Sequence, residues 1–129
     1  MTRINVVPVK ELTRQHLVAE YREIMRLPKN LAKSLNRKTS PFSMSEIPPE
    51  YVLGSGHVKF FYNKMKYLKK RFDELVQEMV NRGYTVSYTD SSIFDSDEVF
   101  FNDYEPTEDA LRINRERIKR RLEKNESVN

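Results

Sequence analysis

The sequence predicts an all-α fold: a single compact domain of three main helices with long connecting loops. Three segments of the 129 residues place apolar side chains at helical spacing, and the stretches between them concentrate proline, serine and acidic residues. Strand-like alternation appears only at Thr85–Thr89, which has no obvious partner and is expected to be extended loop. The length suits one domain over residues 1–129, with the polar end 123–129 expected to fray.

The first helix is expected from about Lys10 to Arg26. Its core-facing side carries apolar residues at helical spacing: Leu17, Val18, Tyr21, Ile24 and Met25. Pro28 is expected to perturb this helix, because proline has no amide donor and its ring clashes with the preceding turn. A basic amphipathic continuation follows, with leucines opposite lysines and arginines: Leu27, Leu31, Leu35, Lys29, Lys33, Arg37 and Lys38. Thr39–Pro49, with three prolines and three serines, is expected to be loop.

The second and third helices follow from the same periodicity. The second is expected to begin after Gly56 and to end at the stop signal Asn81–Arg82–Gly83. Its core stripe comprises eight apolar residues: Phe61, Met65, Leu68, Phe72, Leu75, Val76, Met79 and Val80. The third is expected from near Pro106, a favoured first-turn residue, towards Lys124. Its inward residues are expected to be Leu111, Ile118 and Leu122, with Arg117 and Arg121 on another side.

The charge is segregated along the chain. The formal net charge is +4, but residues 90–109 contain eight acidic residues and no basic one. The remaining chain therefore has 11 acidic and 23 basic residues, a net charge of +12. Such a surface attracts polyanions by counterion release, which leaves DNA, RNA and anionic lipid open as partners. The acidic segment is expected to face away from a bound nucleic acid.

Composition also excludes several classes of protein. There is no cysteine, which excludes disulfides, a thiolate nucleophile and a zinc–thiolate site. No apolar run approaches a membrane span, and the charged beginning of the chain does not resemble a signal peptide. An intracellular protein is therefore expected. Only two histidines are present, so no metal site is expected, and His57 is expected to be a structural or capping residue.

The beginning of the chain offers a nucleophile. Thr2 is small enough for Met1 to be removed, which would leave a free α-amine. Such an amine titrates near ~7.7–8.0, whereas lysine titrates near ~10.4, so the α-amine is a ready nucleophile for carbon electrophiles. A candidate acid/base group is Glu23, at the edge of a helix face shared by Gln15, Arg22 and Arg26. A solvated, salt-bridged helix surface remains an alternative interpretation of this face.

Several motifs carry a resemblance to a known family. The chain begins MTRIN, continues E-L-x-x-Q-H-L-x-A-E-Y-R-E and then has Arg26. Further matches are L-G-S-G-H-V-K-F-F-Y-N-K, K-Y-L-K-K-R, R-G-Y and D-Y-E-P-T-E, over residues 53–64, 66–71, 82–84 and 103–108. On these motifs the chain resembles the bacteriophage-type pyrimidine-dimer DNA glycosylase/AP lyase, the UV-specific endonuclease V family. The resemblance extends to about Leu122.

The resemblance implies a DNA repair enzyme, an endonuclease of base excision repair that acts on UV damage. The α-amine of Thr2 attacks C1′ of the damaged nucleotide, an imine (Schiff base) forms, and β-elimination cuts the strand. Glu23 is then the acid/base residue. The implied DNA-binding residues are Arg3, Gln15, His16, Arg22, Arg26, Arg117 and Arg121. The implied protein is a monomer that needs no cofactor and binds double-stranded DNA containing UV photoproducts, in the cytoplasm of a bacterial or phage-infected cell or in a nucleus.

The end of the chain departs from the family. The phage-type enzymes end in an aromatic segment with tryptophan and several tyrosines, whereas this chain has no tryptophan and ends in seven mostly polar residues. Dimer specificity is therefore less firmly implied than the amine chemistry. Two alternatives stay open: a glycosylase/AP lyase for a different lesion, and a non-catalytic DNA-binding relative. Thr2 and Glu23 together disfavour the second, because simple binding requires neither.

Overall fold

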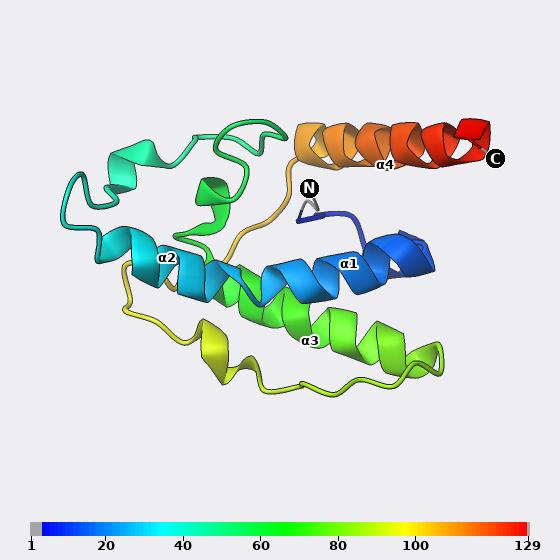
Figure 1. Cartoon of the computed structure of the whole chain (residues 1–129), viewed down its shortest axis with the longest axis horizontal. Coiled ribbons are helices and arrows are strands. Elements are labelled where there is room, and N and C mark those ends of the chain that lie inside the picture. The colour runs from blue at the N-terminus through cyan, green and yellow to red at the C-terminus, as the bar shows by residue number, and fades with distance from the viewer. Residues whose placement is uncertain (1–3, 129) are drawn as a thin grey trace.

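The computed structural model describes residues 4–128, with side chains described through Lys124. Within these residues there is no strand, and four α-helices are present: α1 (Arg14–Ile24), α2 (Leu27–Leu35), α3 (Met65–Asn81) and α4 (Glu108–Val128) (Figure 1). Short 3-10 helices lie between them: η1 (Val9–Glu11), η2 (Met44–Glu46), η3 (Lys59–Phe61) and η4 (Ser91–Phe94). The all-α prediction is confirmed, and the first of the three expected helices is divided into α1 and α2.

The division of the first helix follows its local sequence. Helix α1 starts about four residues later than expected because Thr13 caps it, its Oγ1 accepting the amide of His16 at 3.4 Å. Helix α2 begins just before Pro28, where the missing N–H of proline removes no helical hydrogen bond. Leu27 and Leu31 of α2 are buried. The predicted perturbation at Pro28 is therefore confirmed.

Helix α3 ends as its sequence predicts but starts later. Gly83 adopts φ +84°, and the amides of Gly83 and Tyr84 donate to the carbonyls of Val80 and Met79, each at 2.9 Å. This pattern closes the last turn and requires the left-handed conformation that glycine provides. The helix starts only at Met65, because η3 comes first. The prediction that Val80 lies in the core is wrong, since it is 52% exposed.

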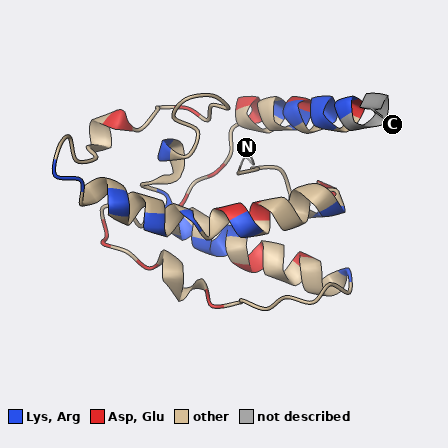
Figure 2. Ribbon diagram, viewed as in Figure 1, with Lys and Arg blue, Asp and Glu red and all other residues tan. Residues whose placement is uncertain are grey.

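The acidic segment, residues 90–109, runs beside α3 and contacts its lysines. Asp95 lies 2.6 Å from the ammonium of Lys69, and Asp103 lies 2.5 Å from that of Lys70. In Figure 1 the yellow part of the segment, around η4, lies on the side of α3 opposite α4. The segment therefore pairs with Lys69 and Lys70 of α3, and its last residue, Asp109, also pairs with Arg112 of α4 at 3.7 Å. Figure 2 shows further basic residues along α1, α2 and α4.

Helix α4 presents a mixed face to the rest of the molecule. Thr107 caps it, its Oγ1 accepting the amide of Ala110 at 3.0 Å. Ala110 and Asn114 are 2% and 0% exposed, while Leu111 and Ile118 are partly buried against the core. The helix runs to residue 128, beyond the expected end near Lys124, so residues 123–128 are helical.

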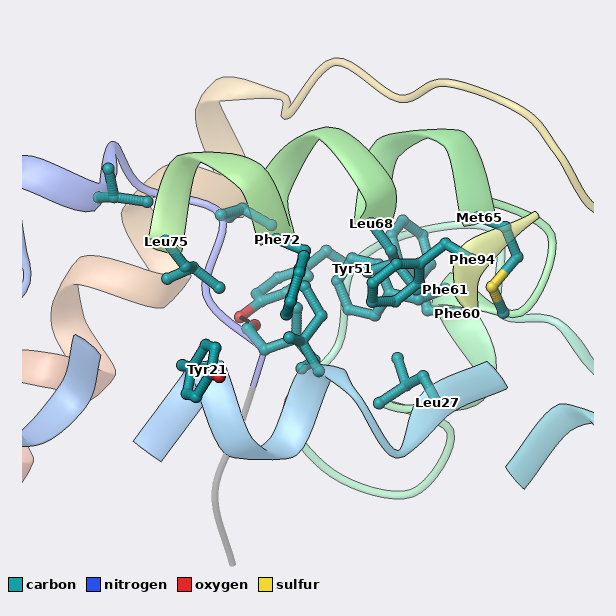
Figure 3. Close-up of a cluster of buried hydrophobic side chains, with 14 of the residues drawn as sticks. Tyr21, Leu27, Tyr51, Phe60, Phe61, Met65, Leu68, Phe72, Leu75 and Phe94 are labelled. Atoms are coloured by element: carbon teal, nitrogen blue, oxygen red, sulfur yellow. Dashed lines mark hydrogen bonds between the residues drawn. The ribbon is translucent and has the colours of Figure 1, made fainter. Parts of the chain in front are cut away.

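The main core lies between α1–α2 and α3. Tyr21 of α1 stacks on Phe72 of α3 with ring centroids 5.8 Å apart, and Phe72 meets Phe94 of η4 at 5.5 Å. Figure 3 shows Tyr51, Phe60 and Phe61 reaching the same core from the segment before α3.

Candidate active site

The first described residues are buried, although they form neither helix nor strand. Residues 4–7 are at most 4% exposed. Their backbone groups bind side chains: Asn114 Oδ1 accepts the amides of Val6 and Val7 at 2.7 and 3.1 Å, and Arg71 Nη1 donates to the Val7 carbonyl at 2.6 Å. These bonds satisfy polar groups that burial would otherwise leave unpaired. The segment is thus fixed between α1, α3 and α4.

A buried polar network holds these side chains in turn. Glu20 of α1 accepts two hydrogen bonds from Arg71, Nε to Oε2 at 2.7 Å and Nη2 to Oε1 at 3.0 Å. Asn5 donates to Glu20 at 2.9 Å and accepts from Asn114 at 2.8 Å. Burial lowers the pKa of Arg71, but attraction and hydrogen bonding by Glu20 outweigh burial and raise that pKa above its ordinary value.

Ile4 is held at both of its backbone polar groups. Its amide donates to His57 Nε2 at 2.8 Å, and its carbonyl accepts from the Tyr51 hydroxyl at 3.0 Å. His57 Nδ1 lies 2.6 Å from the Val52 carbonyl, so Nδ1 carries the proton and Nε2 is the acceptor. The interpretation of His57 as a structural residue is in keeping with these contacts.

One side of α1 faces this segment and α4. At about 100° per residue, His16, Glu20 and Glu23 fall within roughly 60° of one another. Glu20 on this side contacts Asn5 directly. Burial lowers the pKa of His16, and the positive charges of two α4 arginines, Arg117 and Arg121, lower it further. Glu23 is only 15% exposed and accepts a long hydrogen bond of 3.4 Å from Arg26.

The other predicted site residues fall into three groups. Gln15 and Arg22 are exposed on the face of α1 that points away from the core, and Arg26, which directly precedes α2, is exposed as well. Arg117 is partly buried and Arg121 exposed, on the side of α4 that also carries Ala110 and Asn114. Thr2 and Arg3 lie outside the described residues. Figure 2 shows basic residues along α1, α2 and α4.

Besides the proposed α-amine of Thr2, the side-chain amine of Lys64 has an unusual pKa. Burial lowers the pKa of Lys64 to about 8. Its ammonium donates to the Phe60 carbonyl at 2.8 Å and to Asn63 Oδ1 at 3.0 Å, and it lies 3.8 Å from the centre of the Phe60 ring. Because this amine also deprotonates near neutral pH, any test of amine chemistry has to separate it from the α-amine.

The sequence did not predict the residues that hold residues 4–7 in place. Only His57 was singled out, as a structural residue, while the other members of the anchoring set were not: Asn5, Glu20, Tyr51, Arg71 and Asn114. One signal was available. Glu20 borders the apolar side of the first helix and Arg71 precedes Phe72 in the stripe of the second, so two opposite charges enter two packed faces.

No helix among residues 4–128 is both long and apolar enough to cross a membrane. No group of three or more acidic or histidine side chains in the described part of the chain is arranged to hold a metal ion.

Comparison with known proteins identifies a family. A family model described as pyrimidine dimer DNA glycosylase matches residues 1–92 of the chain. The match includes α1, His57 and Arg71, and it ends before α4.

Proposed function

Because the chain belongs to the pyrimidine dimer DNA glycosylase family, we propose that it uses the α-amine of Thr2 to excise the damaged base and then nicks the strand as an AP lyase. The substrate is double-stranded DNA that contains UV-induced pyrimidine dimers.

The observation that carries this proposal is that residues 4–7 are held beside one side of α1. Asn5 is hydrogen-bonded to Glu20, and Thr2 is three residues earlier, at most about 10 Å of extended chain away. Glu23 is on the same side of α1 as Glu20, about 4.5 Å further along the helix axis. Chain length therefore allows the Thr2 amine to approach the Glu23 carboxylate.

The chemistry then divides between these two groups. The Thr2 nitrogen forms a bond to C1′, the N-glycosidic bond breaks, and its electron pair leaves with the base, which gains a proton. The sugar ring opens as the nitrogen lone pair forms the imine. Glu23, as a carboxylate, stabilises the positive charge that develops on the sugar. It then accepts the C2′ proton, and the C3′–O bond breaks, so that the downstream strand leaves with a 5′-phosphate.

The remaining predicted residues would bind the DNA backbone. Arg22, Arg26 and Gln15 are exposed and suited to phosphates, and Arg117 and Arg121 are near His16 on α4. Arg3 follows the nucleophile directly in the chain. Damaged base pairs cost the least to unstack, so bending the duplex at the lesion favours dimers over intact DNA.

The test is borohydride trapping on a duplex with one cyclobutane thymine dimer, alongside undamaged and abasic duplexes. Protein confirmed to begin at Thr2 is expected to form a covalent adduct on the dimer duplex. Acetylation of the α-amine should abolish the adduct, whereas Lys64→Arg, which removes the second amine of lowered pKa, should not. An adduct on the abasic duplex only would contradict the dimer specificity. An adduct that survives acetylation and disappears in Lys64→Arg would contradict the role of Thr2.

A further inference from the structure

Tyr51 and His57 hold Ile4, the first residue that the structure describes. The Ile4 amide is bound by His57 and the Ile4 carbonyl by Tyr51, so both backbone polar groups of one residue are fixed. The two rings also pack edge to face against each other, with centroids 5.4 Å apart, and both contact Phe61. All three side chains are at most 4% exposed.

The loop that carries these two residues is itself rigid. The Val52 carbonyl accepts from His57 Nδ1, and the Gly54 carbonyl accepts from the His57 amide at 3.1 Å. Gly56 adopts φ +91°, and a Cβ there would lie 2.9 Å from Pro48 Cγ. Side-chain and backbone contacts thus leave the His57 ring one position from which to accept the Ile4 amide.

We propose that Tyr51 and His57 are positioning residues that set where the Thr2 amine lies. The inference rests on the proposed function, in which that amine is the nucleophile. Thr2 is two residues before Ile4, so its nitrogen is within about 7 Å of the Ile4 nitrogen by chain length. Among the described residues, Ile4 is the one nearest in the chain to the Thr2 nitrogen, and its two hydrogen bonds fix its position.

The contacts at Ile4 satisfy two buried backbone groups, but they are not the only bonds that hold this segment. Residues 5–7 are held separately by Asn114, Arg71 and Glu20 through five hydrogen bonds. Losing one bond at Ile4 therefore leaves the segment in place, and the fold persists. Its effect is expected at the reacting amine of Thr2, where a displacement of about 1 Å costs as much as ~100-fold in rate.

The hydroxyl of Tyr51 is suited to this task at all working pH values. Burial raises the pKa of Tyr51 well above its ordinary value, so the hydroxyl remains a donor to the Ile4 carbonyl.

The experiment compares four variants. Tyr51→Phe removes only the hydroxyl, and His57→Leu removes the acceptor. His57→Gln restores an acceptor near the Nε2 position, since the glutamine Oε1 reaches a similar distance. Tyr104→Phe is the matched control: it loses a tyrosine hydroxyl from the same aromatic cluster, where Tyr104 packs on Phe60 at 5.3 Å.

Three quantities are measured for each variant: the single-turnover rate of base excision, the affinity for a non-cleavable dimer duplex, and hydrogen exchange of the Ile4 amide. We expect Tyr51→Phe and His57→Leu to slow excision by about 10-fold or more at unchanged affinity, with faster Ile4 exchange. His57→Gln should recover most of the rate, and Tyr104→Phe should match the unmodified protein.

Faster Ile4 exchange at an unchanged excision rate would overturn the proposal. So would a rate loss that only follows the fraction of unfolded protein. Should His57→Leu fail to fold, Tyr51→Phe still decides. Failure of the proposed function looks different: the unmodified protein then forms no adduct, or one that survives acetylation of Thr2, and the positioning role falls with it.

Discussion

Arg71 and Glu20 form a buried ion pair of two hydrogen bonds, 2.7 and 3.0 Å long, between α3 and α1. The two side chains are 4% and 0% exposed. Such a pair stabilises the fold little more than an apolar pair of equal volume would. Removal of one partner is strongly destabilising, because the other is left as a buried charge without a counter-charge. Here the pair also binds Asn5 and the Val7 carbonyl, so it joins two helices to the chain start.

The first prediction concerns this pair. Glu20→Gln is expected to lower the free energy of unfolding by ~3–5 kcal/mol, because Arg71 then stays buried without its counter-charge. Urea unfolding followed by circular dichroism measures the change. Glu116→Gln is the control, since Glu116 is 48% exposed and should change stability by less than ~1 kcal/mol. A loss for Glu20→Gln no larger than the control would show that Arg71 finds other compensation.

The second prediction concerns Glu23. Glu23→Gln is expected to slow strand cleavage by ~10²-fold or more while leaving duplex affinity nearly unchanged, because the amide cannot accept a proton. Stability should change by less than ~1 kcal/mol, because the bond to the exposed Arg26 is long. Single-turnover cleavage and duplex binding measure the two effects. Asp73→Asn, at an exposed carboxylate on α3, is the control. Undiminished cleavage by Glu23→Gln would remove Glu23 from the mechanism.

Local patterns predicted the helices of this fold well. The Pro28 break and the Gly83 stop each depend on the backbone chemistry of one residue, which is visible in the sequence. The all-α class, which was predicted from helical periodicity, is confirmed, and Thr85–Thr89 forms no strand, as expected. Val80 shows the limit, because helical spacing does not tell how far the packed face of a helix extends.

The contacts that hold residues 4–7 could not be predicted in this way. Its backbone groups bind side chains that are distant in sequence, up to 108 residues away for Val6 and Asn114. Residues 4–7 have neither helical nor strand periodicity, so a local pattern carries no information about their partners. Arg117 and Arg121 continue the Asn114 face of α4, and only the packing of α4 brings them near His16.

The third prediction concerns two exposed arginines, Arg22 of α1 and Arg26 just before α2. Arg22→Ala and Arg26→Ala are expected to weaken duplex binding and to reduce the slope of log affinity against log salt concentration by ~0.9 per lost phosphate contact. Binding titrations at several salt concentrations measure the slope. Lys70→Ala is the control, because Lys70 is paired with Asp103 of the acidic segment. An unaltered slope in both arginine variants would show that neither arginine contacts a DNA phosphate.

The fourth prediction concerns the pH dependence of His16. Burial and the charges of Arg117 and Arg121 hold its pKa below the ordinary value, so the folded protein favours the neutral imidazole. The unfolded chain takes up a proton near pH ~6.5, and the stabilising contribution is therefore complete above that pH and lost as the pH falls below it. The stability advantage over His16→Gln should shrink between about pH 7 and pH 5. Denaturant unfolding at each pH measures it, and an advantage independent of pH would contradict the depressed pKa.

The same imidazole reports on DNA. Arg117→Gln should raise the His16 titration midpoint, followed by NMR, because one of the charges that lower it is removed. If DNA phosphates bind Arg117 and Arg121, adding a duplex screens both charges and brings negative charge closer, so the midpoint should rise in the complex as well. His57 supplies the other histidine signal, and the His16→Gln spectrum assigns the two. A His16 midpoint that moves in Arg117→Gln but not in the complex would place the bound phosphates away from α4.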